Sequence, residues 1–228
     1  MTTDADIITS MKLLLTSSGI TNKSIEKALR ILLGKPYKDA CLTFIPTAAN
    51  VEHGDKSWLV EDMNNFRVLG LKSFDIMDIS AVSEDIWLPS LKNADILVFG
   101  GGNADYLLTW IQNSGLCKHL PKLMESKIYV GISAGSMIAA HSISLSSADI
   151  LYYEKTGTHK DRKGLGFVDF EIRPHLNSEW FPNVRIDYLE KFAKDSPKTF
   201  YAIDDNTAIE VVDGTIRIIS EGIWKKFH

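Results

Sequence analysis

Short apolar segments alternate with amphipathic segments along most of the chain, and this alternation restricts the fold more than any other feature. The apolar segments at residues 11–16, 40–45, 73–79, 96–100 and 127–130 are typical of strands buried on both faces. Between them, residues 23–34 and 55–70 have the spacing of amphipathic helices, the second capped by Asp55. The pattern predicts an α/β fold with a mostly parallel sheet and helices on both of its faces.

The last third of the chain has a different pattern. Residues 199–204, 207–212 and 215–220 are short β-rich segments, and an Asp213-Gly214 pair joins the last two. Such a pair favours a tight hairpin, so we expect an antiparallel extension of the sheet. Residues 145–166 are polar and contain glycine, which predicts a surface excursion. We expect one domain over residues 11–228, preceded by a flexible extension at residues 1–10.

Composition and charge limit the function. The chain of 228 residues has a net charge of −4 and scattered basic residues, which argues against nucleic-acid or membrane-surface partners. Its two cysteines lack metal or CxxC spacing, and the N-terminus lacks the basic and apolar regions of a signal peptide. We expect a cytoplasmic protein with small-molecule partners and with neither a metal nor a cofactor.

A serine between two glycines is the most informative motif. Residues 131–135, GISAG, match the G-x-S-x-G pattern and lie between an apolar strand and a helix-compatible segment. In that setting Ser133 is either a nucleophile on a sharp turn or a small residue at the start of a helix.

A serine nucleophile needs a histidine base, and that base needs an acidic partner. His175 is the strongest of six histidines, because Pro174 ends a predicted strand directly before it and ligands bind at strand ends. His141 follows Ser133 by eight residues on the expected helix, roughly 12 Å away, and is therefore too far. The favoured acid is Asp149 in the predicted excursion. Its rivals are Glu154 and Asp169.

A glycine run precedes the serine by one strand. Residues 100–103, GGGN, lead from an apolar strand into a helix, but they fit neither a Walker motif nor G-x-G-x-x-G. Backbone N–H groups at such a turn can bind an anion. We expect an oxyanion hole formed by Gly101 or Gly102 together with Ala134, with a purely structural tight turn as the alternative.

Three motifs in this order carry a family resemblance. ILVFGGGNADYLL, YVGISAGSMIAA and IRPH together resemble the peptidase E family of serine exopeptidases (peptidase family S51), the aspartyl dipeptidases, and the related cyanophycinases. The resemblance implies a flavodoxin-like fold related to class I glutamine amidotransferases. By the same resemblance, Ser133 would be the nucleophile, His175 the base, and Gly102 and Ala134 the oxyanion donors. Asp149 would match the acidic member if one residue is inserted after the serine turn.

Two departures from that family bear on specificity. Members that require an N-terminal aspartate carry an arginine after the catalytic histidine, where this chain has FPN at residues 181–183, and Ile132 stands where they often have tryptophan. Losing a charge-assisted pair weakens carboxylate recognition, so strict Asp-X specificity is not expected. Asn103, Arg173 and Arg185 are the predicted substrate-binding residues, and either arginine could replace the missing one.

The resulting hypothesis is a serine exopeptidase that hydrolyses dipeptides or short peptides through a Ser-His-Asp triad and an acyl-enzyme. One alternative is an esterase of the α/β-hydrolase type, although His175 follows Ser133 closely for that fold. Another is an inactive binding protein on an amidotransferase-like scaffold. A homodimer is left open.

Overall fold

A seven-stranded sheet forms the centre of the computed structural model, which describes residues 11–154, 161–195 and 198–228. The N-terminal extension expected at residues 1–10 lies outside the described residues. The strands lie in the order β11-β10-β1-β5-β4-β2-β3; the five from β1 to β3 run parallel, and β10 and β11 are antiparallel. Their bounds are β1 (Lys12–Thr16), β2 (Cys41–Ile45), β3 (Ser73–Ile76), β4 (Ile96–Phe99), β5 (Ile128–Ile132), β10 (Thr207–Val212) and β11 (Thr215–Ser220).

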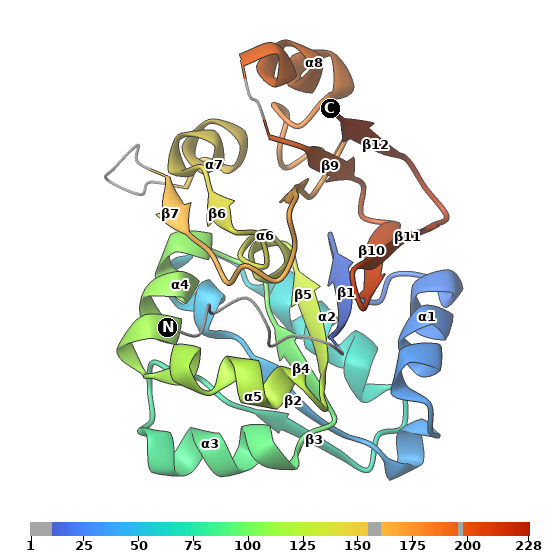
Figure 1. Ribbon diagram of the computed structural model, residues 1–228, viewed down its shortest axis with the longest axis vertical. Helices are drawn as coiled ribbons and strands as arrows, with labels where there is room; N and C mark the ends of the chain where they lie inside the picture. The colour runs from blue at the N-terminus through green and yellow to red at the C-terminus, as the bar shows by residue number, and fades with distance from the viewer. Residues whose placement is uncertain (1–10, 155–160, 196–197) are drawn as a thin grey trace, which may run out of the picture.

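Helices cover both faces of this sheet because successive strand residues point to opposite sides. In β1, Leu14 packs with α1 and α2, whereas Leu13 and Leu15 pack with the helices of the other face. Figure 1 shows the two helix layers on either side of the strands. The helices that flank the sheet are α1 (Lys23–Leu33), α2 (Ser57–Arg67), α3 (Glu84–Asn93), α4 (Ala104–Asn113), α5 (Leu120–Met124) and α6 (Ala134–Met137), with short 3-10 helices η1 (Tyr37–Asp39), η2 (Thr47–Val51) and η3 (Leu116–Lys118).

A smaller layer lies above the large sheet in Figure 1. It contains a three-stranded sheet in the order β12-β9-β8, a two-stranded pair and two helices. These elements are β6 (Ser142–Ile143), α7 (Leu145–Tyr152), β7 (Arg162–Lys163), β8 (Glu171–Arg173), α8 (Ile186–Asp195), β9 (Phe200–Ile203) and β12 (Trp224–Phe227). The chain passes from β9 in this layer directly into β10 of the large sheet, so the two sheets are connected beside β1.

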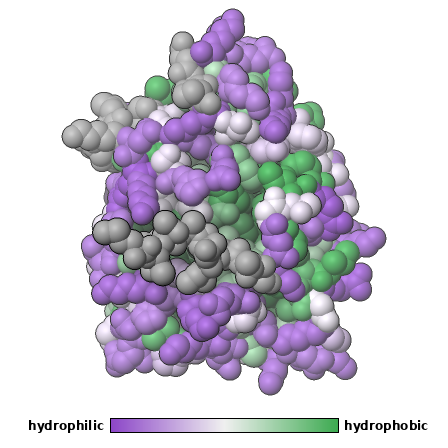
Figure 2. All heavy atoms as spheres, viewed as in Figure 1, coloured by the Kyte–Doolittle hydropathy of each residue, from purple (hydrophilic) through white to green (hydrophobic). Residues whose placement is uncertain are grey.

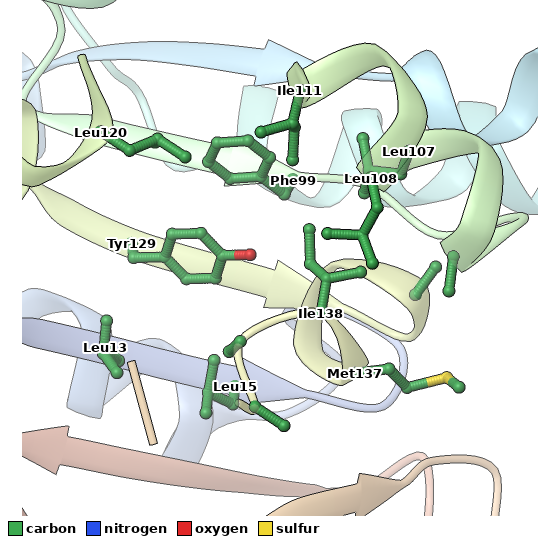
Figure 3. Close-up of a cluster of buried hydrophobic side chains, with 14 of the residues drawn as sticks. Leu13, Leu15, Phe99, Leu107, Leu108, Ile111, Leu120, Tyr129, Met137 and Ile138 are labelled. Carbon is green, nitrogen blue, oxygen red and sulfur yellow. The ribbon is translucent and has the colours of Figure 1, made fainter. Parts of the chain in front are cut away.

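Aromatic packing between β4 and β5 supports the strand ends that carry the glycine motifs. The rings of Phe99 and Tyr129 stack with centroids 4.7 Å apart among the leucines and isoleucines shown in Figure 3. Both residues are fully buried, and the Tyr129 hydroxyl donates to the Gly135 carbonyl at 2.6 Å. This bond connects the second residue of β5 to the turn that follows the strand.

The structure confirms the predicted sheet and hairpin but changes several element boundaries. Asp213 and Gly214 both have positive φ, as a two-residue hairpin requires. Residues 145–166, predicted as a surface excursion, begin with helix α7, and the helix expected at residues 55–70 begins at Ser57. Asp55 instead accepts a hydrogen bond from the Ser57 backbone N–H at 2.9 Å, just before the helix. The sequence did not predict α7 because its apolar residues do not lie on one side of the helix: Leu145 and Leu151 are buried, whereas Ile150 is exposed.

Hydrophilic side chains cover most of the face in Figure 2, and hydrophobic atoms gather at mid-height on it. Within the part of the chain that the structure describes, each helix is too short or too polar to cross a lipid bilayer.

Candidate active site

Ser133 occupies a strained turn between β5 and α6. Its backbone has φ 47° and ψ −109°, outside the usual regions for a residue with a side chain, and its N–H donates to the Thr16 carbonyl at 3.1 Å. The flanking glycines permit this turn: a Cβ on Gly131 would lie 2.7 Å from the backbone of Gly135, and one on Gly135 would lie 2.0 Å from the Phe99 carbonyl oxygen. The turn therefore depends on close backbone packing that only glycine allows.

Gly135→Ala is expected to lower the free energy of unfolding by about 3 kcal/mol or more, because the new methyl group would overlap the Phe99 carbonyl. Urea unfolding monitored by circular dichroism measures this difference. Gly101→Ala is the matched control, since its added Cβ would meet Ser133 Cβ at an ordinary 3.4 Å. Equal unfolding midpoints for the two variants would contradict the close packing at Gly135.

His175 contacts the serine from the smaller layer. Its Nε2 lies 2.9 Å from Ser133 Oγ, and its ring stacks on Phe181 with centroids 4.9 Å apart. The residue follows Pro174 at the end of β8 and has φ 63°, a left-handed conformation. The Tyr152 hydroxyl donates to the Pro174 carbonyl at 3.2 Å and so connects α7 to this turn. The predicted pair Ser133 and His175 is thus brought within hydrogen-bonding distance.

Asp205, in the turn between β9 and β10, supplies the carboxylate that contacts His175. Its Oδ1 lies 2.7 Å from His175 Nδ1 and accepts a hydrogen bond from Ser17 Oγ at 2.6 Å. Ser17 Oγ in turn accepts the His175 backbone N–H at 2.7 Å. Burial by itself raises the pKa of Asp205, but hydrogen bonds from His175 and Ser17 and the attraction of His175 outweigh it and bring the pKa to about 2. Asp205 is therefore ionised at neutral pH.

The acids expected from the sequence lie elsewhere. Asp149 is half-buried in α7, where its backbone carbonyl accepts from Tyr153 N–H, and none of the hydrogen bonds in the described residues joins it to His175. Asp169 pairs with His141 at 2.7 Å, and Glu154 Oε2 accepts the Ala104 N–H at 3.2 Å. Asp149 was expected in a loop that folds back on the histidine. Because this segment is a helix, the imidazole instead meets Asp205.

The sequence did not identify Asp205 as a site residue. The residue follows Ser17 by 188 positions, and antiparallel pairing of β10 with β1 brings the two together. The sequence feature that could have indicated Asp205 is the pair Asp204-Asp205, which follows one apolar strand and precedes the strand that extends the sheet. That feature identifies a polar turn but not which strand end it adjoins.

The glycine run lies beside the serine. A Cβ on Gly101 would stand 3.4 Å from Ser133 Cβ, while one on Gly102, which has φ 124°, would lie 2.3 Å from the Ala48 carbonyl oxygen. The Asn103 N–H donates to that same carbonyl at 2.9 Å. Within the described residues, the N–H groups of Gly101, Gly102 and Ala134 have no protein acceptor. They remain available to an anion at this turn.

The three predicted substrate-binding side chains have other partners. Asn103 caps α4 by accepting the Tyr106 N–H at 2.8 Å. Arg173 is buried against Glu171, to which it donates a hydrogen bond, and lies over two phenylalanine rings. Arg185 donates to the carbonyls of Ser178, Phe181 and Val184 and so shapes the loop after His175. Each of the three side chains thus has a partner within the described residues.

Glu154→Gln is expected to make stability less sensitive to pH. Burial, followed by repulsion from Glu52 and Asp105, raises the pKa of Glu154 to about 8 even though the Ala104 N–H opposes the shift. The folded chain thus keeps a proton that the unfolded chain loses near pH 4, so stability falls as pH rises from about 4 to 8. Glutamine removes this loss, which is on the order of a few kcal/mol at pH 8.

Urea unfolding at pH 5 and pH 8 measures the effect, with exposed Glu179→Gln as the control. The gain of Glu154→Gln over the natural chain should be much larger at pH 8 than at pH 5. Equal gains at the two pH values would contradict a proton on buried Glu154.

Comparison with known proteins identifies the family. The sequence pattern of Peptidase family S51 matches residues 13–219. This chain belongs to Peptidase family S51. A peptidase E from Nostoc sp. is 28% identical over 84% of this chain and 76% of its own length. The uncharacterized peptidase Lmo0363 of Listeria monocytogenes is 30% identical over 74% of this chain and 80% of its own.

Solved structures support the fold of this S51 peptidase. A crystal structure of a candidate peptidase E protein from Listeria monocytogenes EGD-e superposes with a TM-score of 0.76 at 24% identity, covering 93% of this chain and 100% of that one. A peptidase from an acI-B1 Actinobacterium has a TM-score of 0.72 at 20% identity, covering 96% and 91%. The flavodoxin-like, amidotransferase-like architecture implied by the sequence motifs is confirmed, and the chain is a serine-type peptidase.

Proposed function

We propose that this protein is a serine exopeptidase that hydrolyses dipeptides or short peptides through Ser133, His175 and Asp205. One observation carries the proposal: the His175 ring contacts both other residues. Its Nε2 lies within hydrogen-bonding distance of Ser133 Oγ, and its Nδ1 within hydrogen-bonding distance of Asp205 Oδ1. An ionised Asp205 holds the proton of the imidazole on Nδ1 and leaves Nε2 free to accept one. Family membership supports the same chemistry.

In the first half of the reaction, Ser133 Oγ attacks the scissile carbonyl carbon and its proton passes to His175 Nε2. The carbonyl oxygen becomes an anion, which the N–H groups of Ala134 and of Gly101 or Gly102 would bind. As the C–N bond breaks, His175 returns the proton to the leaving amine. The product is an ester between Ser133 and the amino-terminal part of the substrate.

In the second half, a water molecule attacks that ester and gives one proton to His175 Nε2. The tetrahedral anion forms again at the same N–H groups, and the bond to Ser133 Oγ breaks. The proton on His175 moves to Ser133, which restores the free enzyme and releases a carboxylic acid. Asp205 stays ionised throughout and stabilises the imidazolium formed in each half.

The substrate preference we propose is broader than Asp-X. Recognition of an aspartate side chain needs a free cationic group near Ser133. Arg173 donates a hydrogen bond to Glu171, and Arg185 donates hydrogen bonds to three backbone carbonyls. Members of the family that require an N-terminal aspartate carry an arginine where this chain has residues 181–183. Phe181, the first of these three residues, stacks on His175.

Two experiments test the proposal: hydrolysis of a panel of dipeptides, and labelling of the protein with a fluorophosphonate probe. Dipeptides with Asp, Ala, Leu, Met and Lys at the amino terminus should all be cleaved, with Asp-X no more than about tenfold preferred over the others. Mass spectrometry should find the probe on Ser133. Turnover of p-nitrophenyl esters without peptide cleavage would favour an esterase, and absence of both labelling and turnover would favour a binding protein.

A further inference from the structure

One buried carboxylate beside the site has no partner of its own. Four carboxylate side chains are buried in the described residues, and three of them receive hydrogen bonds: Glu154 from a backbone N–H, Glu171 from Arg173 and Lys198, and Glu210 from Arg217. The fourth is Asp62, which exposes only 8% of its surface. Within the described residues it receives no hydrogen bond and forms no ion pair. Its carboxylate oxygens are not among the fully buried atoms without a partner, so they reach solvent and can receive a partner from outside the chain.

The position of Asp62 connects it to the candidate active site. A Cβ placed on Gly19 would lie 3.4 Å from Asp62 Oδ1 and 3.3 Å from Ile132 Cδ1. Ile132 directly precedes the nucleophile candidate Ser133. Gly19 follows Ser17, which contacts Asp205. Asp62 Oδ1 therefore lies against the two segments that lead into the Ser-His-Asp arrangement.

A second residue of α2 reaches the site from the same face. Trp58 is one helical turn before Asp62, so the two side chains are neighbours on the helix surface. A Cβ on Gly101 would lie 3.6 Å from Trp58 Cζ3 and 3.4 Å from Ser133 Cβ. This face of α2 therefore extends from the glycine run to the Ser17–Gly19 loop and forms a wall beside Ser133. The wall is apolar at Trp58 and acidic at Asp62.

The environment favours a cation at this position. Burial, and after it the nearby negative charges of Glu61 and Asp205, together raise the pKa of Asp62 to about 7. A positive group placed beside Asp62 would offset both causes. In a dipeptide, the α-ammonium is attached to the carbon next to the scissile carbonyl, two bonds from the atom that Ser133 would attack. A group that binds this ammonium must consequently lie close to the nucleophile, and Asp62 Oδ1 lies beside Gly19, which also adjoins the Ile132 side chain next to Ser133 in the sequence.

We infer that Asp62 binds a primary ammonium group on the amino-terminal residue of the substrate and so selects peptides that carry one. The inference rests on the proposed exopeptidase function and deepens it by naming the substrate class. An acidic wall beside the nucleophile explains why an exopeptidase would reject internal peptide bonds, whose nitrogen carries no charge. The ammonium can come from the α-amino group or from a lysine side chain, and these two sources can be separated experimentally.

Three dipeptides distinguish the sources: Met-Ala, acetyl-Met-Ala and acetyl-Lys-Ala. If the α-ammonium is bound, kcat/KM for Met-Ala should exceed that of both acetylated peptides by about 10- to 100-fold. If the side-chain ammonium is bound, acetyl-Lys-Ala should exceed acetyl-Met-Ala by a similar factor. In Asp62→Asn the preference should fall to within about threefold through a higher KM, whereas Asp62→Glu should restore part of it.

Glu61→Gln is the matched control, because it removes one negative charge from the neighbouring, exposed position of the same helix. It should keep the preference of the natural chain. Calorimetric binding of Met-Ala and acetyl-Met-Ala to Ser133→Ala, with and without Asp62→Asn, gives a readout that does not depend on turnover. A preference for ammonium-bearing peptides that survives Asp62→Asn in both assays, or no such preference in the natural chain, overturns the inference.

The same experiments separate this inference from the proposed function. Cleavage of all three peptides at similar rates by the natural chain would leave the peptidase function intact and refute the role of Asp62. Absence of cleavage together with loss of fluorophosphonate labelling would refute the function itself. Thermal unfolding of Asp62→Asn shows whether the variant is folded, and Asp62→Glu supplies the comparison if it is not.

Discussion

Ser133→Ala is expected to lower kcat for dipeptide hydrolysis by about 10⁴- to 10⁶-fold while leaving the unfolding temperature nearly unchanged. Alanine removes the oxygen that lies 2.9 Å from His175 Nε2 but keeps the Cβ and the backbone turn. Water then has to attack the peptide directly, with help only from the imidazole and the backbone N–H groups. Initial rates with a cleaved dipeptide, measured by release of the free amino acid, give the factor.

The control for this variant is Ser126→Ala, an exposed serine at the end of α5. It should retain full activity and fluorophosphonate labelling, whereas Ser133→Ala should lose both. Peptide hydrolysis by Ser133→Ala at more than a tenth of the natural rate would show that another group attacks the substrate.

Asp205→Asn is expected to lower kcat by about 10²- to 10⁴-fold, whereas Asp149→Asn should change it less than twofold. The amide keeps the shape of the side chain but not the charge that stabilises an imidazolium, and its NH2 group can face His175 Nδ1 and favour the wrong tautomer. Asp149 makes no comparable contact with the histidine in the described residues. Steady-state kinetics at pH 7.5 on both variants measures the difference.

The pH dependence of unfolding supplies an independent readout for Asp205. Its pKa of about 2 lies below that of an exposed aspartate, so the folded chain releases this proton more readily than the unfolded chain. The resulting stabilisation is complete above about pH 4 and is lost as pH falls towards 2. Asp205→Asn should therefore show a weaker loss of stability between these values. Full activity of Asp205→Asn together with an inactive Asp149→Asn would restore Asp149 as the acid.

Local sequence was sufficient for the features that depend on a few adjacent residues. Alternating apolar segments predicted the parallel sheet because strands buried on both faces must be apolar throughout. The GISAG motif predicted the strained serine turn because only glycine permits the backbone contacts seen on either side of Ser133. Pro174 predicted the end of β8 and hence the position of His175, since proline excludes further helix or central strand there.

The sequence was a poor guide where a residue's role depends on what packs against it. Arg173 was predicted to bind substrate, yet it is buried against Glu171, because β8 lies in the second sheet beside β9. Asn103 was predicted to contact substrate, and the structure shows in addition that its Oδ1 caps α4. Both are polar residues next to motif residues. Sequence proximity alone does not say which way their side chains point.

The sequence by itself determined the architecture, the serine turn and the histidine, because each follows from periodicity or from the backbone freedom of glycine and proline. Only the tertiary structure decided that Asp205 contacts His175 and that Asp62 lies beside Gly19. Asp205 reaches Ser17 because β10 adds to β1 at the edge of the parallel strands. Asp62 reaches Gly19 because α2 packs across that same sheet. Contacts between segments so far apart in the chain depend on strand order and helix packing, which local patterns do not encode.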